Sequence, residues 1–96
     1  MNIIEFQTLM AQLYIHRDRK RGLNKTMLWL ISEIGELAEA IRLEDQDKIA
    51  EEMADVLAWL CSLANLANID LENAACNKYP GQCARCNSKP CICQEG

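Results

Sequence analysis

Apolar residues recur at helical intervals along most of the chain, and no stretch shows the strict alternation of a half-buried strand. The pattern predicts a first amphipathic helix that starts near Ile3 and runs into a basic cluster. Gly22 then interrupts the pattern and ends this helix. The apolar positions of the first helix are Ile3, Phe6, Leu9, Met10, Leu13 and Tyr14.

A second helix is predicted from about Lys25 to Arg42. Asn24 stands directly before it and can serve as its N-cap, because a short polar side chain can accept a hydrogen bond from the first turn. Apolar residues then recur every three or four positions, and we expect them to form the buried face. They are Leu28, Ile31, Ile34, Leu37, Ala38 and Ile41.

The third predicted helix begins at Gln46 or Asp47, where Asp45 and Asp47 offer N-caps, and extends to Asn68. Past Val56 it has few polar side chains, so it should be buried by more than one neighbour. A short fourth helix is expected from Asp70 to about Asn77. Pro80 and Gly81 follow and prevent its continuation.

These elements predict an all-α fold, an antiparallel helical bundle with a cysteine-rich C-terminal tail. The chain has 96 residues, half of them hydrophobic, which suits one small domain with modest stability of its own. We therefore expect oligomerisation to complete the bundle. The predicted division is a helical domain over residues 1–78 and a tail over residues 79–96.

Four acidic residues stand out within the two long helices: Glu33 and Glu36 in one, Glu52 and Asp55 in the other. Acids three residues apart share one side of a helix, about 60° apart around the axis. In each helix the first acid borders the apolar arc. The two helices therefore repeat one arrangement of acids beside an apolar face.

An antiparallel hairpin that turns near Glu44 would bring these acids together, since helices joined by a short loop usually pack side by side. In that register Glu36 faces Glu52, and Glu33 faces Asp55. One turn further on, Trp29 lies level with Trp59. The two indoles can pack in a core or at a subunit interface, or they can stack on a nucleobase.

Four carboxylates at the edge of a core need a counter-charge, because each suffers desolvation and repulsion. Oxygen ligands select Mg²⁺ or Mn²⁺, and Mg²⁺ is commonly held by carboxylates together with substrate phosphates. The alternative is ordinary surface decoration, since glutamate is a strong helix former. Because both pairs occur in matching register, we favour a metal site at Glu33, Glu36, Glu52 and Asp55.

The net charge of -4 is unsuited to binding a nucleic-acid polymer. Basic residues nevertheless gather around the first interhelical turn, where Arg21 and Lys25 can bind a polyphosphate or simply face solvent. The N-terminus lacks the pattern of a signal peptide, and no apolar run reaches the length of a bilayer span. We expect a cytoplasmic protein that does not bind a membrane.

The tail contains four cysteines, Cys83, Cys86, Cys91 and Cys93, spaced C-x2-C-x4-C-x-C. A C-x2-C pair is a common half of a four-cysteine zinc site. Disulfides and free thiols are the alternatives, but disulfides fit poorly with a chain that lacks an export signal. We favour a structural Zn²⁺, because few large apolar side chains are present to order the tail. Two further cysteines, Cys61 and Cys76, are expected in the core.

The segments LISEIGELAEAI (residues 30–41) and EEMADVLAWL (residues 51–60) closely resemble the MazG-like nucleoside triphosphate pyrophosphohydrolases. The resemblance covers roughly the first 80 residues and includes the E-x-x-E … E-x-x-D acids of that family. It implies Mg²⁺-dependent hydrolysis of a (deoxy)nucleoside triphosphate to a monophosphate and pyrophosphate, with the four acids as metal ligands. It also implies a homodimer or homotetramer, and Lys78 as a phosphate contact.

The predicted function is therefore that of a nucleotide pyrophosphohydrolase. Glu33, Glu36, Glu52 and Asp55 are its catalytic and metal residues, and substrate contacts are expected from Trp29, Arg21, Lys25 and Lys78. The alternative is a non-catalytic helical module that binds a structural ion with the acids and docks a partner through the cysteine tail. Turnover of nucleotides distinguishes the two.

Overall fold

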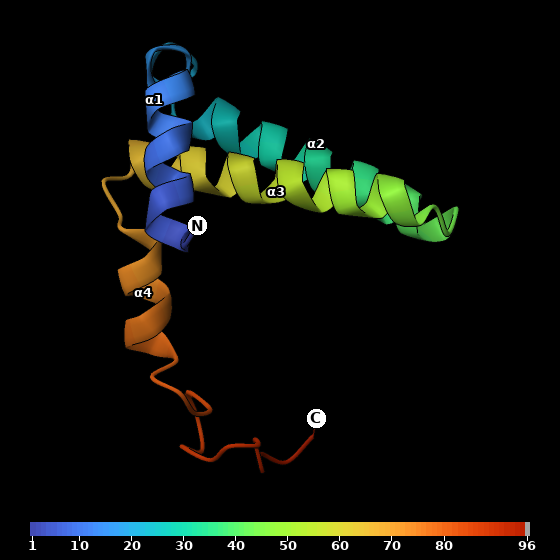
Figure 1. The fold of residues 1–96 in the computed structure, drawn as a ribbon, viewed down its shortest axis with the longest axis vertical. Coiled ribbons are helices and arrows are strands. Elements are labelled where there is room, and N and C mark those ends of the chain that lie inside the picture. The colour runs from blue at the N-terminus through green and yellow to red at the C-terminus, as the bar shows by residue number, and fades with distance from the viewer. Residues whose placement is uncertain (96) are drawn as a thin grey trace.

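The computed structural model describes residues 1–95, so Gly96, the last residue of the predicted tail, lies outside the described part. It contains the helices α1 (Ile3–Arg21), α2 (Leu23–Arg42), α3 (Gln46–Leu66) and α4 (Leu71–Lys78). No strand occurs over residues 1–95. The predicted all-α fold is thus confirmed (Figure 1).

The helices α2 and α3 form a long antiparallel hairpin, and α1 packs across one end of it (Figure 1). The other end of the hairpin extends away from α1. The short helix α4 lies beyond the N-terminal end of α1, where the backbone N–H of Ile4 donates to Glu72 Oε1 at 3.4 Å. The tail continues from α4, away from the hairpin.

The turn between α1 and α2 consists of Gly22 alone, which corrects the prediction of Asn24 as the N-cap. The helix α2 begins at Leu23, and Gly22 occupies the cap position with φ 84° and ψ 165°. Residues with a Cβ essentially do not adopt this conformation. The Thr26 hydroxyl donates to the Gly22 carbonyl at 2.8 Å. A one-residue turn leaves Asn24 already inside the helix, so it cannot cap.

Of the two N-caps predicted for the third helix, Asp45 is confirmed and Asp47 lies inside the helix, while Asp70, the predicted start of the fourth helix, is the N-cap of α4. Asp45 Oδ1 accepts a hydrogen bond from the backbone N–H of Lys48 at 3.1 Å and caps α3. Asp70 Oδ1 accepts one from the N–H of Asn73 at 3.0 Å and caps α4. Each carboxylate satisfies a donor that the first helical turn leaves free.

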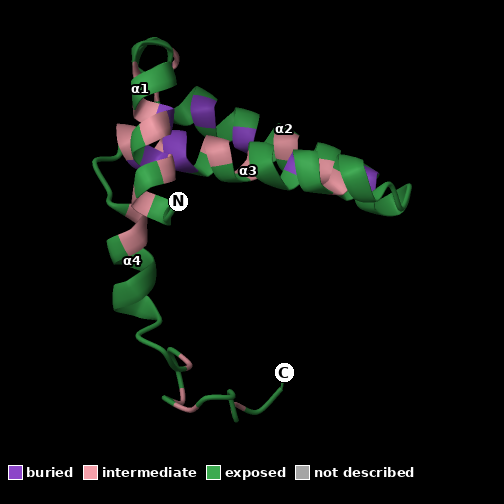
Figure 2. Cartoon of the chain, in the orientation of Figure 1, coloured by how far each residue is buried: buried purple, intermediate pink, exposed green. Residues whose placement is uncertain are grey.

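The core is small and concentrated where α1 crosses the hairpin (Figure 2). Met10, Leu30, Cys61 and Ala64 are buried there. Gln7 of α1 is buried too, and it joins the helices through side-chain hydrogen bonds. Its amide donates to the Ile69 carbonyl at 2.7 Å and accepts from the Leu71 N–H at 3.0 Å. These bonds connect α1 to the bend between α3 and α4.

The predicted buried face of the second helix is wrong for the single chain. Leu28, Ile31, Ile34 and Ile41 are 65%, 53%, 47% and 51% exposed, and Ala38 is also exposed. The side of α2 that faces α3 instead contains Thr26, Leu30 and Ala40, which are buried, and the half-buried Leu37. The reason is that α1 covers only one end of the hairpin, so the chain supplies no helix for the remaining apolar residues.

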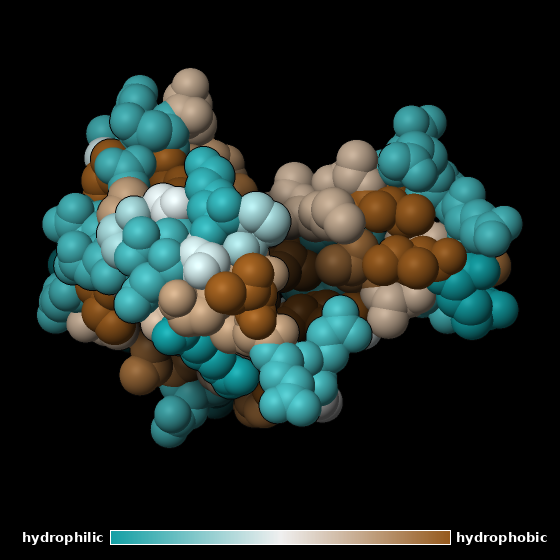
Figure 3. All heavy atoms as spheres, turned by 90° about the horizontal axis from the view of Figure 1, so that it is seen from below, coloured by the Kyte–Doolittle hydropathy of each residue, from teal (hydrophilic) through white to brown (hydrophobic). Residues whose placement is uncertain are grey.

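The third helix contacts both α1 and α2, as its apolar circumference predicts, but one of its sides is also uncovered. Met53, Leu57 and Leu60 are 53%, 42% and 39% exposed. Figure 3 shows apolar surface on the part of the hairpin that extends beyond α1.

No single helix of the described chain is long and apolar enough to cross a membrane. The helices α3 and α4, which meet at a bend of 99°, reach that length and composition only when taken as a pair.

Candidate functional site

The hairpin brings three of the four predicted acids into one cluster. Glu33 and Glu36 come from α2 and Glu52 comes from α3, and each offers a carboxylate oxygen within 4.8 Å of the others. We call these three residues the acid cluster. The hairpin register is independently confirmed by Trp29 and Trp59, which stack with ring centroids 5.8 Å apart and planes inclined by 10°.

Two oxygens of the acid cluster are buried without a partner. Within the described chain, neither Glu33 Oε2 nor Glu52 Oε2 receives a hydrogen bond. Burial raises the pKa of Glu33, and the nearby charges of Glu36, Asp55 and Glu52 raise it further. The pKa of Glu52 is raised first by burial and then by the charge of Glu36. Unpaired anionic oxygens in such surroundings favour a bound cation.

The fourth acid, Asp55, lies beside the cluster. It follows Glu52 by three residues on α3 and therefore lies on the same side of that helix. Its charge contributes to the raised pKa of both Glu33 and Glu52. Its side chain is exposed and lines a cavity of about 290 Å³ between α1 and α3. Asp55 therefore connects the acid cluster with this cavity.

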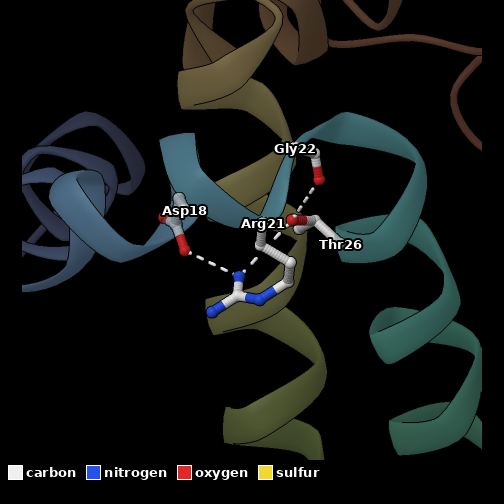
Figure 4. A network of polar contacts seen from close by, with 4 residues as sticks. All are labelled: Asp18, Arg21, Gly22 and Thr26. Atoms are coloured by element: carbon white, nitrogen blue, oxygen red, sulfur yellow. Dashed lines mark hydrogen bonds and ion pairs between the residues drawn. The ribbon is translucent and has the colours of Figure 1, made fainter.

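Arg21, at the end of α1, lines the same cavity. Figure 4 shows its guanidinium between Asp18 and Thr26. Its Nη1 lies 2.9 Å from Oδ1 of the buried Asp18 and donates to Thr26 Oγ1 at 3.4 Å. The guanidinium carbon stands 4.7 Å from the ring centroid of Trp59. An ion pair, a hydroxyl and an aromatic face thus hold Arg21 in place.

The stacked tryptophans lie one helical turn from the acids Glu33 and Asp55, and Trp59 contacts α1 through Arg21. Trp59 is half-buried and contacts both Trp29 and the Arg21 guanidinium. Trp29 is 52% exposed and borders a shallow hollow with Leu28 and Ser32. Part of the Trp29 ring is therefore accessible to a ligand.

The other two predicted substrate contacts are not brought to the acid cluster within one chain. Lys25 is exposed on the first turn of α2, about 12 Å along the helix axis from Glu33. Lys78 ends α4, which packs on α1, and its ammonium lies 5.7 Å from the ring centroid of Tyr79. The roles of both lysines stay predictions.

Lys48 is a site residue that the sequence analysis missed. Its Nζ lies 3.8 Å from Glu52 Oε1 and 3.5 Å from Glu51 Oε2. The charge and hydrogen bond of Glu51 raise the pKa of Lys48, and the charges of Glu52 and Glu36 raise it further. Its position four residues before Glu52 was the available signal. Tyr14, which lines the cavity, was also not predicted as a site residue, whereas Arg17, which lines it too, belongs to the basic cluster that the sequence analysis considered for polyphosphate binding.

The four tail cysteines converge, as their spacing predicts. One sulfur from each lies within 4.8 Å of the other three. Cys61 is buried in the core as expected, whereas Cys76 is exposed on α4 and corrects the prediction of a core position. Because α4 contacts the rest of the chain on one side only, most of its surface faces solvent.

The fold and the site define an all-α hairpin protein with a carboxylate cluster suited to a divalent cation. A family model, the MazG nucleotide pyrophosphohydrolase domain, matches residues 21–86. The chain therefore belongs to the MazG nucleotide pyrophosphohydrolase domain family. The matched segment contains the whole hairpin and the acid cluster, and it extends into the tail. No curated protein matches the chain significantly.

Proposed function

We propose that the chain is a Mg²⁺-dependent nucleoside triphosphate pyrophosphohydrolase that converts a (deoxy)nucleoside triphosphate to the monophosphate and pyrophosphate. The observation that carries this proposal is the acid cluster with its two buried, unpartnered carboxylate oxygens. Membership of the MazG nucleotide pyrophosphohydrolase domain family supports this class of reaction. Hard oxygen ligands such as these carboxylates suit Mg²⁺ or Mn²⁺.

The role proposed for the acids is to bind the cation that the reaction needs. Glu33, Glu36 and Glu52 would bind the metal, with Asp55 beside them at the cavity. Bound there, Mg²⁺ would neutralise phosphate oxygens and make a coordinated water more acidic. Water attacks a phosphorus of the α–β anhydride, its proton passes to a carboxylate, and the bridging bond breaks with the electron pair on the departing phosphate oxygen.

The cavity beside Asp55 supplies the substrate contacts. Arg21 and Arg17 line it and can bind phosphate oxygens, since guanidinium groups match phosphate geometry. The exposed face of Trp29 can stack on a nucleobase. Lys25 lies four residues before Trp29, on the same side of α2, and can contact the end of the substrate that lies farther from the acid cluster.

We also propose that a second copy of the chain covers the apolar side of the hairpin. Exposed apolar residues on α2 follow one another in steps of four, three and seven residues, namely Met27, Ile31, Ile34 and Ile41. On α3 the steps are four and three, namely Met53, Leu57 and Leu60. This spacing is typical of helices packed in a bundle. Ile34 lies about 100° from Glu33, whereas Glu36 lies about 60° in the opposite direction. The apolar side can therefore pair in a homodimer without covering the acids.

The reaction is tested by incubating the purified protein with a panel of NTPs and dNTPs and Mg²⁺, and measuring monophosphate and pyrophosphate. Equal amounts of the two products support the proposal. Asp55→Asn should lower the rate at least about a hundredfold, because it removes an anionic oxygen beside the metal ligands and so weakens the binding of the cation that neutralises the phosphates. The matched control is Glu51→Gln, an exposed acid of the same helix. No turnover across the panel would favour the non-catalytic helical module.

The dimer is tested by sedimentation equilibrium. Ile34→Glu should produce monomers, because it introduces a charge into the apolar side of the hairpin. Leu43→Glu is the control, since Leu43 is equally apolar and 60% exposed but lies at the hairpin turn. A dimer that persists in Ile34→Glu would contradict the assignment of this surface.

A further inference from the structure

The cysteine tail lies away from the acid cluster, and the proposed hydrolysis makes no use of it. Little apolar surface of the tail is buried, because its large apolar side chains Tyr79 and Ile92 are 58% and 75% exposed. Nevertheless the backbone turns back on itself at two hydrogen bonds. The Cys83 N–H donates to the Ser88 carbonyl, and the Asn87 N–H donates to the Cys83 carbonyl, both at 3.0 Å. Asn87 completes this turn in the left-handed region, with φ 60°.

The turn brings all four sulfurs to one point. The Sγ atoms of Cys83 and Cys93 are 3.7 Å apart, and those of Cys86 and Cys91 are 3.9 Å apart. Four thiolates at about 2.3 Å from a tetrahedral zinc ion are separated by about 3.8 Å along each edge. Both separations match this edge. They are far longer than the roughly 2.05 Å of a disulfide bond.

Backbone amides point at three of the four sulfurs. The N–H of Arg85 donates to Cys83 Sγ at 3.4 Å, and the N–H of Ile92 donates to Cys86 Sγ at 3.4 Å. The N–H of Cys93 donates to Cys91 Sγ at 3.3 Å. Such bonds stabilise negative charge on sulfur and orient the ligands of a metal.

We propose that Cys83, Cys86, Cys91 and Cys93 bind one structural Zn²⁺ that folds residues 83–93. Four thiolates fill a tetrahedral coordination shell, so the ion has no open position for water or substrate. Its role is to replace the apolar core that this segment lacks. The proposal is independent of the proposed hydrolase activity, and its test reads metal content and tail structure rather than turnover.

The first experiment measures metal in the full chain, purified under reducing conditions from cells supplied with zinc and iron. We expect one zinc per chain by mass spectrometry of the elements. The double variant Cys86→Ser/Cys91→Ser should lose it. The matched control Cys76→Ser removes an exposed thiol outside the cluster and should keep the full zinc content. Iron in place of zinc, or equal zinc in both variants, would overturn the proposal.

The second experiment replaces the ion with Co²⁺. The wild type and Cys76→Ser should show the thiolate charge-transfer bands and intense visible bands of a tetrahedral four-thiolate site, and Cys86→Ser/Cys91→Ser should not. Hydrogen exchange then reports the fold. Chelation should remove protection from the amides of Arg85, Ile92 and Cys93 while α1, α2 and α3 stay protected. A metal-free chain with two disulfides by mass, or tail amides unaffected by chelation, would refute a zinc-folded tail.

Discussion

The acid cluster predicts that Mg²⁺ binding and a neutralising substitution both stabilise the protein, because each relieves the repulsion among its buried carboxylates. The perturbation is Glu33→Gln, which keeps the size of the side chain and removes its charge. In the metal-free protein Glu33 is disfavoured as an anion by burial and by the charges of Glu36, Asp55 and Glu52. We therefore expect the metal-free variant to melt at a higher temperature than the metal-free wild type. With Mg²⁺ present, the wild type should gain stability and the variant should gain almost none.

The size of the Mg²⁺ effect follows from binding and from chain length. At a free Mg²⁺ concentration about ten times the dissociation constant, binding stabilises the native state by about 1.4 kcal/mol. The unfolding entropy of a chain of 96 residues is roughly 0.2 kcal/mol per K. Dividing the stabilisation by this entropy predicts that the Tm rises by about 7 °C. If Glu33→Gln weakens binding about a hundredfold, the same Mg²⁺ raises the Tm of the variant by less than about 1 °C.

The assay is thermal unfolding followed by far-UV circular dichroism, with a chelator or with Mg²⁺. The control is Glu51→Gln, because Glu51 is exposed and pairs with Lys48 at 3.5 Å but is not part of the acid cluster. This variant should respond to Mg²⁺ like the wild type. Equal Mg²⁺ shifts in wild type and Glu33→Gln, or a lower metal-free Tm for Glu33→Gln, would refute the reasoning.

Three further predictions concern the frame around the site, each read from urea unfolding. Gly22→Ala should destabilise the fold by about 1–3 kcal/mol, because the backbone at φ 84° strains any residue with a Cβ, although no atom lies within 4 Å of the added carbon; an unchanged midpoint would contradict this. Gln7→Met should cost about 2 kcal/mol and expose the amides of α4 to exchange, whereas the exposed Gln12→Met should not. Arg21→Met should cost about 3 kcal/mol by leaving the buried Asp18 unpaired, and adding Asp18→Asn should restore much of the loss; if the double variant is no more stable than Arg21→Met, the ion pair is not the cause.

Much of the hairpin could be predicted because the residues that determine it lie close to one another in the sequence. Asp45 and Asp70 mark the starts of α3 and α4 by side-chain hydrogen bonds to the next residues. The register follows from the short loop near Glu44, and the stacked tryptophans confirm it. The convergence of Glu33, Glu36 and Glu52 required only helical periodicity and this register.

The buried side of α2 could not be predicted, because it depends on partners far away in the chain. Apolar residues occupy more than one side of this helix, and hydrophobicity alone does not tell which side α3 covers. The structure selects the side with Thr26 and Leu30, and Ile31 and Ile34 remain exposed. A second copy of the chain, as proposed, would reconcile the predicted and observed faces.

The cavity was missed for a similar reason. Its wall combines Asp18 and Arg21 of α1 with Asp55 and Trp59 of α3, and these residues meet only when α1 crosses the hairpin. A basic cluster in the sequence indicates positive charge, but it does not tell toward which part of the fold the side chains point. The one-residue turn at Gly22 decides where Arg21 lies, and neither its φ nor its role as the cap is encoded by a pattern of apolar residues.

The most direct test of the central claim is to identify the products formed from a nucleoside triphosphate by the wild type and by Glu33→Gln, each with and without Mg²⁺. The acid cluster predicts that the wild type releases monophosphate and pyrophosphate only with Mg²⁺, and that Glu33→Gln loses most of this activity while remaining folded. Release of orthophosphate and a nucleoside diphosphate, or an undiminished rate in folded Glu33→Gln, would contradict the claim that these carboxylates hold the metal that promotes cleavage of the α–β bond.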